Sequence, residues 1–320
     1  MANVTFFKAT DMSNLSFSGF SLTGATATQI TLSDNVHIAT IEGNFTYGGT
    51  QVFGTITNIE EYTSQTNGLG PILDVQISGL NIDANTAGNL ILNNQVQALL
   101  QLGLGGNNLI TGSNGNDTLV GFTGNDVFIP NGGSDIVKGG SGFEQVVIHA
   151  PIGSSTVNVA SNFAVVNSAE GQDTLFDVDR IQFSDGVVAL DIQGNAGNAY
   201  RLYQAAFART PDKPGLSFWT HQLDLGVNIQ IVAQDFVNSS EFQSVYGANP
   251  TNAHIVDLFY LNVLGRLPDA AGSAFWVNQL NAGTAVGAVL QGFAVSSENH
   301  GLVDAKLAQG IVLDSSAFLV

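Results

Sequence analysis

Glycine returns at every ninth residue through one central stretch of the chain, residues 103–147. Divided into nines, this stretch reads GLGGNNLIT, GSNGNDTLV, GFTGNDVFI, PNGGSDIVK and GGSGFEQVV. Glycine and asparagine tolerate left-handed backbone angles, so the first half of each nonapeptide can turn sharply. The second half suits a short strand, because it alternates a polar sixth residue with an apolar eighth. The sixth residues are Asn108, Asp117, Asp126, Asp135 and Glu144, and the eighth are Ile110, Leu119, Phe128, Val137 and Val146.

Such nonapeptides predict a parallel β-roll, in which two repeats make one coil of 18 residues with a turn and a strand on each side. Each eighth residue would point inward and pack on the residue one coil away. Each sixth residue would lie where the turn meets the strand, so its side chain could reach the gap between stacked turns. Side chains that are two nonapeptides apart in the sequence are therefore expected to be neighbours in space.

Acids stacked in this way favour a hard cation. Calcium takes about six to eight oxygen ligands, and stacked turns would supply main-chain carbonyls beside the carboxylates. We expect Asp117 to pair with Asp135 and Asp126 with Glu144, while Asn108 and Asp126 would form a weaker third site. This predicts roughly two to three calcium ions. The candidate ligands are Asp117, Asp126, Asp135, Glu144 and Asn108, together with the turn residues Gly112, Asn114, Asn116, Gly121, Thr123, Asn125, Ser134, Gly139 and Ser141.

Calcium would also control whether this stretch folds. Without the ion the stacked carboxylates would repel one another, and the roll has little apolar core of its own. The free energy of binding would then become free energy of folding. The alternative is a surface loop rich in glycine, asparagine and aspartate. It is disfavoured because three successive repeats carry aspartate in phase.

Together with the β-roll, the segments on either side of it predict a multidomain α+β protein. Residues 1–101 alternate apolar and polar residues as strands do, which predicts a small β domain with a short helix near residues 86–102. Residues 148–193 are also strand-like and would cap the open end of the roll. The final segment, residues 302–320, becomes uncharged and apolar after Asp314.

Residues 199–299 have apolar residues at helical spacing and contain an internal duplication. YRLYQAAFARTPDKPGLSFWTHQL recurs without gaps as LFYLNVLGRLPDAAGSAFWVNQL. This predicts an all-α domain built from two copies of one unit, residues 200–242 and 257–299.

Three matched pairs of residues stand out in the two copies. The aspartates are expected to cap helices, with a metal or partner site as the alternative. The arginines are expected to bond loop carbonyls or a neighbouring acid. The tryptophans are expected to lie in the core, and sugar stacking would require that they be exposed. These pairs are Arg209 with Arg266, Asp212 with Asp269, and Trp219 with Trp276.

Composition excludes several classes of function. The chain has 26 acids and 8 bases, a net charge of −18, and should repel nucleic acid and anionic lipid. It has no cysteine, which excludes disulfides and zinc–thiolate sites. No apolar stretch is long enough to span a bilayer, so no membrane insertion is expected. The N-terminus, MANVTFFKATDMSN, lacks the features of a cleavable signal peptide.

Residues 103–193 resemble the haemolysin-type (RTX) calcium-binding repeats, with their trailing cap, of type I-secreted bacterial toxins, proteases, adhesins and surface-layer proteins. Pro130 and Asn131 stand where the fourth repeat would carry a glycine pair. The segments ARTPDKPGLSFW and GRLPDAAGSAFW resemble a bacterial domain of uncharacterised function that often accompanies such repeats and is distantly similar to phycobilisome linkers. The resemblance implies a secreted protein, exported by a three-component channel that reads an uncleaved C-terminal signal. Residues 302–320 suit that signal.

The sequence therefore favours a non-enzymatic, calcium-folded protein with a structural or adhesive role in a matrix, surface layer or cell contact. Its partners would be calcium and either copies of itself or a cell-surface glycan or protein. Two alternatives stay open: a secreted hydrolase with its site in residues 1–101, and a carbohydrate-binding protein. The five histidines form no H-E-x-x-H motif, and no G-x-S-x-G elbow or phosphate loop occurs. Glu60 and Glu61 are adjacent on a predicted strand and would point to opposite faces.

Overall fold

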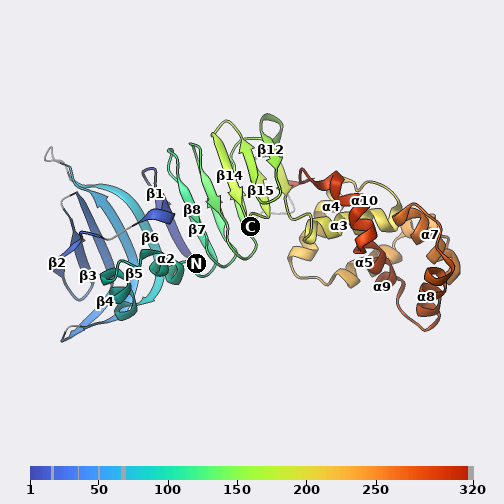
Figure 1. The fold of residues 1–320 in the computed structure, drawn as a ribbon, viewed down its shortest axis with the longest axis horizontal. Coiled ribbons are helices and arrows are strands. Elements are labelled where there is room, and N and C mark those ends of the chain that lie inside the picture. The colour runs from blue at the N-terminus through green and yellow to red at the C-terminus, as the bar shows by residue number, and fades with distance from the viewer. Residues whose placement is uncertain (16–17, 35, 50, 66–69, 316–320) are drawn as a thin grey trace. The chain divides into compact units, whose positions relative to one another are not determined.

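The computed structural model describes residues 1–15, 18–34, 36–49, 51–65 and 70–315. It divides into two compact units, Met1–Ser184 and Asp185–Val320, and combines large β-sheets with a helical C-terminal region (Figure 1). The expected α+β class is confirmed. None of the described helices is both long and apolar enough to cross a membrane.

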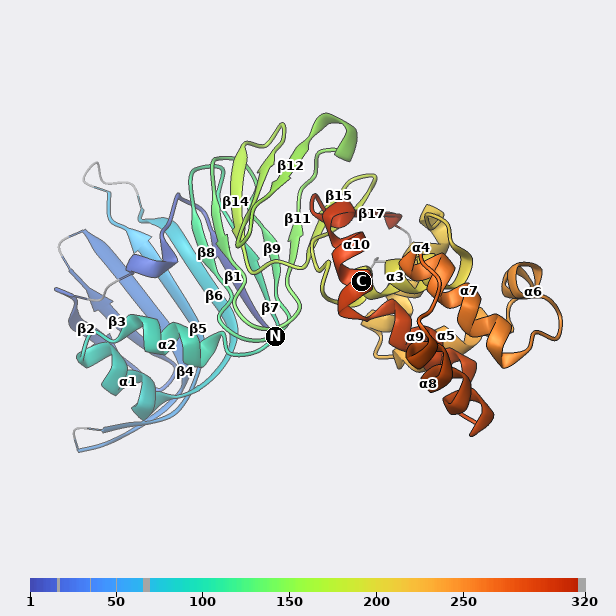
Figure 2. The ribbon, with the colours of Figure 1, turned by 45° about the vertical axis from the view of Figure 1, so that its right-hand side comes forward.

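The first unit begins with an antiparallel sheet that is covered on one face by two helices. The elements are β1 (Ala2–Phe6), a 3-10 turn (Met12–Asn14), β2 (Ser21–Ala25), β3 (Gln29–Ser33), β4 (His37–Gly48), β5 (Gln51–Thr63), β6 (Ile72–Asp83), α1 (Ala84–Leu92) and α2 (Val96–Gly103). Figure 2 shows α1 and α2 lying across the sheet. The covered face carries Ile41, Ile59 and Ile77 side by side on three strands, as the alternation of the sequence predicts.

The single short helix expected near residues 86–102 is in fact two helices. The first ends at Leu92, and Asn94 adopts a left-handed backbone angle (φ 52°) before the second begins at Val96. Asparagine tolerates this conformation better than most residues, which explains why the chain bends there.

Each nonapeptide contributes one short strand, and successive strands alternate between two parallel sheets. These strands are β7 (Asn108–Thr111), β8 (Thr118–Val120), β9 (Val127–Ile129), β10 (Ile136–Lys138) and β11 (Gln145–Val147). β9 pairs with β7 and β11, and β10 pairs with β8, so every pairing joins strands that are two nonapeptides apart. This confirms the expected 18-residue coil. The eighth residues are all completely buried, as expected.

The N-terminal strand joins the antiparallel sheet to the nonapeptide strands, a connection that the sequence analysis did not predict. β1 pairs antiparallel with β6 on one side and parallel with β7 on the other, where Val4 lies beside Ile110. The chain then passes β8, where the Thr118 N–H donates to the carbonyl of Thr10 (2.7 Å). Residues 2–12 therefore form one coil ahead of the first nonapeptide, and residues 1–101 share a sheet with residues 103–147.

Strands that follow the last nonapeptide extend both parallel sheets. They are β12 (Thr156–Val159), β13 (Ala164–Asn167), β14 (Gln172–Phe176) and β15 (Arg180–Phe183). β14 pairs in parallel with β10, and β15 pairs in parallel with β11. The β12–β13 hairpin lies at the edge of one sheet. Residues 172–183 of the segment expected to cap the roll therefore continue its two sheets by one more coil.

The second unit is built from helices that follow the sequence duplication. The first copy forms α3 (Asn195–Phe207), α4 (Lys213–Asp224), α5 (Ile229–Asn238) and α6 (Ser240–Tyr246), and the second forms α7 (Asn252–Leu264), α8 (Ala270–Asn281), α9 (Val286–Ala294) and α10 (Ser297–Leu307). Both copies contribute to a single buried core rich in aromatic residues. Two strands, β16 (Gly186–Ala189) and β17 (Ile311–Leu313), pair antiparallel.

The segment expected to be a C-terminal tail is partly folded into this unit. Residues 302–307 complete α10, where Val303 and Leu307 are buried, and β17 places Leu313 in the core. Residues 316–320 lie outside the described residues.

Equivalent residues of the two copies make equivalent contacts. Arg209 donates through Nε to Glu241 Oε1 (2.6 Å), and Arg266 donates in the same way to Glu298 Oε1 (2.7 Å). Both arginines also donate to the carbonyl of the next residue. The prediction that they bond a neighbouring acid and loop carbonyls is confirmed.

The remaining matched pairs also take their predicted roles. Asp212 and Asp269 accept hydrogen bonds from the third backbone N–H beyond them (2.9 and 2.8 Å), and so are the N-caps of α4 and α8. Trp219 and Trp276 are half-buried and pack against the core, each on a phenylalanine of the following helix with ring centroids 5.0 and 5.3 Å apart. The tryptophans thus pack against the core but are only partly buried.

Candidate metal centre

The sixth residues of the nonapeptides form two ladders of buried side chains. All five are at most 2% exposed, which is unusual for the four that are acids. In each ladder a carboxylate accepts a hydrogen bond from the backbone N–H of the sixth residue one coil earlier. The donors and acceptors are Asn108 N–H to Asp126 Oδ1 (2.7 Å), Asp117 N–H to Asp135 Oδ1 (2.7 Å) and Asp126 N–H to Glu144 Oε2 (3.0 Å). The expected neighbours are therefore adjacent.

The second oxygen of several of these carboxylates has no donor. Within the described residues, Asp126 Oδ2, Asp135 Oδ2 and Glu144 Oε1 are buried and accept no hydrogen bond. A buried charged oxygen without a partner is strongly unfavourable. These oxygens therefore fit a bound cation, which would compensate their charge.

Asp117 differs from the other acids because protein donors already occupy both of its oxygens. Its Oδ2 accepts from the backbone N–H and the hydroxyl of Ser113 (2.7 and 2.9 Å), and its Oδ1 accepts from the Thr10 N–H (2.6 Å). Asn108 is likewise engaged, since its side chain donates to Asp126 Oδ1 (3.0 Å). The uncompensated oxygens are thus concentrated in the later coils.

Glycine backbone packs closely against the same carboxylates. A Cβ added to Gly121 would lie 2.5 Å from Asp126 Oδ2, and one added to Gly139 would lie 2.7 Å from Cγ of Glu144. At Gly112 the nearest carboxylate oxygen, Asp117 Oδ2, would be 3.1 Å away. Only glycine lets the backbone approach the acids this closely, which a site built from both carbonyl and carboxylate oxygens requires.

Burial raises the pKa of the acids whose second oxygen has no donor. The pKa of Asp126 rises to about 6, and those of Asp135 and Glu144 rise to about 7. Burial is the largest cause in each case, and neighbouring carboxylates add to it at Asp135 and Glu144. A cation would favour the ionised form of each acid and so release protons on binding.

The remaining predicted ligands divide by position in the repeat. The first-position glycines are buried, whereas the third- and fifth-position residues lie on exposed turns. Two fifth-position side chains are already used within the protein, because Asn116 Oδ1 accepts from Ser134 N–H (2.9 Å) and Asn125 Oδ1 accepts from Phe143 N–H (3.1 Å). The buried glycines are Gly112, Gly121 and Gly139, and the exposed residues are Asn114, Asn116, Thr123, Asn125, Ser134 and Ser141.

No group of three acidic or histidine side chains converges as a metal site in the part of the chain that the structure describes.

Two further acids, which were not predicted from the sequence, continue the ladders. Asp135 N–H donates to Asp173 Oδ1 (3.1 Å), and Glu144 N–H donates to Asp179 Oδ2 (2.8 Å). Asp173 is 1% exposed, its Oδ2 accepts no hydrogen bond from the described residues, and burial raises its pKa to about 6.

A signal for Asp173 was present in the sequence. GQDTL, residues 171–175, repeats the GNDTL of residues 115–119. The β12–β13 hairpin separates Asp173 from Asp135 by 38 residues instead of 18, so a search at fixed spacing does not find it.

The two adjacent glutamates considered for a hydrolase lie on opposite faces of β5, as expected. Glu61 pairs across the sheet with Ala39 and Val75. Glu60 accepts hydrogen bonds from the Tyr62 hydroxyl (2.5 Å) and from Gln76 Nε2 (2.7 Å). The pair therefore cannot act on one substrate as two cooperating carboxylates.

Comparison with known families matches two parts of the chain. Residues 102–137 match the model of the RTX calcium-binding nonapeptide repeat (4 copies), and residues 233–303 match a domain of unknown function, DUF4214. The second match covers the end of α5 from residue 233, all of α6, and the second helical copy as far as Val303 in α10. RTX repeats bind calcium, so calcium binding by the nonapeptide segment is supported.

Among solved structures, the chain is similar to the extracellular lipase LipA from Serratia marcescens. The match has 29% identity and a TM-score of 0.24, and it covers 24% of this chain but only 13% of the lipase chain. No match was found among curated proteins.

Proposed function

We propose that this chain is a secreted bacterial calcium-binding protein with a structural or adhesive role, whose nonapeptide segment folds as a calcium β-roll after export. The observation that carries the proposal is the set of buried carboxylate oxygens without donors, on Asp126, Asp135, Glu144 and Asp173. The match to the RTX repeat over residues 102–137 supports the calcium-binding part of this proposal. Export would use a channel that reads a C-terminal signal, as the sequence resemblance implies.

Two pairs of acids fit best as the carboxylate ligands. Asp126 and Glu144 adjoin in one ladder, and Asp135 and Asp173 adjoin in the other. We therefore place one calcium ion at each pair. A third ion would use Asp117 or Asn108, but protein donors already serve their side-chain oxygens, from Ser113 and Thr10 to Asp117 and from Ala2 N–H to Asn108 Oδ1.

Main-chain carbonyls would complete the oxygen ligands. They would come from the glycines beside the carboxylates and from the exposed turns. Bound calcium would supply the positive charge that compensates the negative charge of these buried acids. The residues whose main-chain carbonyls are proposed as ligands are Gly112, Asn114, Asn116, Gly121, Thr123, Asn125, Ser134, Gly139 and Ser141.

Folding and calcium binding would be coupled because the buried acids are costly when ionised and uncompensated. The coil would then remain loose where calcium is scarce and become rigid where calcium is abundant. This suits a chain that must pass a channel unfolded and act outside the cell.

Calcium titration of the full chain tests the proposal. Far-UV circular dichroism should show a gain of β-structure with calcium that EGTA reverses, and native mass spectrometry should count about two to three ions. Magnesium at the same concentration should give a much weaker response, because it demands stricter octahedral geometry. An unchanged spectrum with EGTA and no bound ions in native spectra would contradict the proposal.

Light scattering on the same samples tests the self-assembling variant of the structural role. Polymers that form with calcium and dissociate with EGTA would favour a matrix or surface layer. Monomers under both conditions would instead favour a cell-surface glycan or protein as the partner.

The hydrolase and carbohydrate-binding alternatives have less support. A hydrolase would need at least two carboxylates free to act together in a deep pocket. Asp11, Glu61 and Asp74 line one opening, but Asp11 and Asp74 already accept hydrogen bonds from Ser13 and Thr63. A carbohydrate site would need an exposed aromatic platform, whereas Trp219 and Trp276 pack on the helical core.

A further inference from the structure

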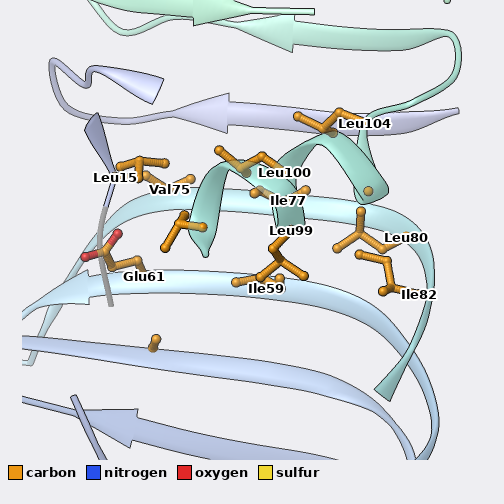
Figure 3. Close-up of a pocket in the computed structure, with 13 residues that line it drawn as sticks. Leu15, Ile59, Glu61, Val75, Ile77, Leu80, Ile82, Leu99, Leu100 and Leu104 are labelled. Carbon is orange, nitrogen blue, oxygen red and sulfur yellow. The ribbon is translucent and has the colours of Figure 1, made fainter. Parts of the chain in front are cut away.

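An apolar cavity of about 280 Å³ lies between the N-terminal sheet and α2 (Figure 3). Ile59 and Ile77 line it from the sheet, and Leu99 and Leu100 line it from the helix. Protein interiors are close-packed, and few voids exceed the size of a water molecule. A space this large is therefore a candidate binding site.

Glu61 breaks the pattern of the strand that forms the cavity wall. It pairs across the sheet with Ala39 on β4 and Val75 on β6, and all three residues line the cavity. The alternation of β5 calls for an apolar residue at this place. Glu61 is the one charged residue among the described residues that line the cavity. Figure 3 shows it at the end opposite Leu80 and Ile82.

The carboxylate of Glu61 makes no hydrogen bond or ion pair with any of the described residues. Burial raises its pKa, and the nearby Asp74 adds to this effect while His37 and Lys8 oppose it. A polar residue that faces a core without a partner is expected at functional sites more than elsewhere.

The same end of the cavity meets a polar opening. Lys8, Asp11, His37, Glu61 and Asp74 line this opening. Asp74 is already engaged, by the Thr63 hydroxyl and by Lys8 Nζ (3.9 Å), and Asp11 accepts from Ser13 N–H (2.9 Å). Glu61 is therefore the carboxylate left to receive a group that enters.

We propose that this cavity binds a small amphipathic amine, with its alkyl body against the leucine and isoleucine side chains and its ammonium group at Glu61. A cavity of 150 Å³ holds benzene, so this one would take on the order of ten heavy atoms. The three acids of the opening outnumber its one lysine, which disfavours a ligand with a carboxylate head. The site is separate from the acids assigned to calcium.

Isothermal titration of the full chain in calcium buffer at neutral pH tests the proposal with three probes of equal length. Octylamine should bind saturably with one molecule per chain. Octan-1-ol should bind more weakly, and octanoate at least about tenfold more weakly than the amine, since it would place two negative charges together. Absence of saturable octylamine binding, or octanoate binding as tight as octylamine, would overturn the proposal.

Glu61→Gln tests the head-group contact, and Glu60→Gln is its matched control on the opposite face of the same strand. We expect E61Q to weaken octylamine binding about tenfold or more while leaving octan-1-ol unchanged, and E60Q to change neither. Equal effects of the two variants would contradict a role for Glu61.

Ala39→Ile tests the cavity itself, because Ala39 lines it and is completely buried. The larger side chain should fill the space and abolish binding of both octylamine and octan-1-ol. Its melting temperature should not fall, which separates a filled cavity from a misfolded chain. Unchanged octylamine binding by a folded A39I variant would place the ligand elsewhere and overturn the proposal.

Discussion

At the scale of the residue, the ladder acids use their two oxygens differently. In Asp126, Asp135, Glu144 and Asp173, one oxygen is held by a backbone N–H of the preceding coil and the other has no donor within the described residues. The first contact fixes the carboxylate in place. The second oxygen leaves a buried negative charge that a cation would neutralise.

Replacing Asp135 with Asn tests the charge without changing the shape of the side chain. The amide keeps an oxygen for the Asp117 N–H but removes the negative charge next to Asp173. We expect calcium affinity to fall at least about tenfold, because even outer-shell partners of a metal have effects of this size. Equilibrium dialysis with labelled calcium measures it. Asp235→Asn, at an exposed position on α5, should leave the affinity unchanged.

Replacing Gly121 with Ala tests the close approach of backbone to carboxylate. The new methyl group would press on Asp126 Oδ2 and on the Gly139 carbonyl, and overpacking of this kind destabilises by about 1–3 kcal/mol. Urea unfolding in saturating calcium measures the loss. Gly106→Ala is the control, since a Cβ there would meet nothing within 4 Å. Equal stability of the two variants would show that the backbone is not confined at Gly121.

At the scale of the element, the helical unit contains two arginine–carboxylate pairs that differ in burial, Arg266–Glu298 and Arg201–Asp304. Arg266 and Glu298 are each more than 40% exposed, so their pairing is screened by water. Arg201 is completely buried and donates to Asp304 (2.8 Å) as well as to the Ile192 carbonyl. Removing the acid would leave the Arg201 charge buried with less compensation.

Two substitutions on α10 compare these pairs directly. Asp304→Asn should destabilise the helical unit by about 2–4 kcal/mol, since breaking a buried pair strands one charge. Glu298→Gln should change the stability by less than about 1 kcal/mol. Chemical unfolding followed by helical circular dichroism gives both values. A larger loss in E298Q than in D304N would contradict this assignment of burial.

At the scale of the whole molecule, two units are stabilised by different means. The unit of residues 1–184 contains ladders of buried acids, whereas the unit of residues 185–320 is organised around a core of aromatic and aliphatic side chains. Only the first would depend on calcium. The protein should therefore unfold in two steps when calcium is limiting.

Hydrogen exchange with and without EGTA checks this division. Removal of calcium should release the backbone amides of residues 103–183 while those of residues 195–307 stay protected. Loss of protection in both ranges together would show that the helical unit also requires the ion. Addition of excess calcium should restore the protected amides.

The calcium-free protein should also respond to pH in an unusual direction. Burial raises the folded-state pKa of Asp126 and Asp173 to about 6 and of Asp135 and Glu144 to about 7, so folded molecules keep protons that unfolded chains release near pH 4. The stability of the unit of residues 1–184 should consequently fall as pH rises from about 4 to 7. Each shift of two units is worth about 2.7 kcal/mol. Hydrogen exchange of residues 103–183 in EGTA at pH 5 and pH 7.5, corrected for the intrinsic exchange rates, tests this, and stronger protection of these amides at pH 7.5 would contradict it.

The local sequence pattern was sufficient to predict much of this protein's fold. Glycine spacing predicted the 18-residue coil and the inward side of each short strand, because turn geometry and side-chain alternation depend on residues that are close in sequence. The same reasoning found the helix caps at Asp212 and Asp269 and the adjacency of the sixth residues.

Contacts between distant segments were decided only by the tertiary structure. β1 reaches β7 across more than a hundred residues, the β12–β13 hairpin displaces Asp173 from the regular spacing, and α2 leaves a cavity beside Glu61. No short-range pattern records such pairings, because they depend on which distant surfaces can bury one another. That is also why the sequence indicated a row of acids, while the fold determined which of their oxygens remain without a donor.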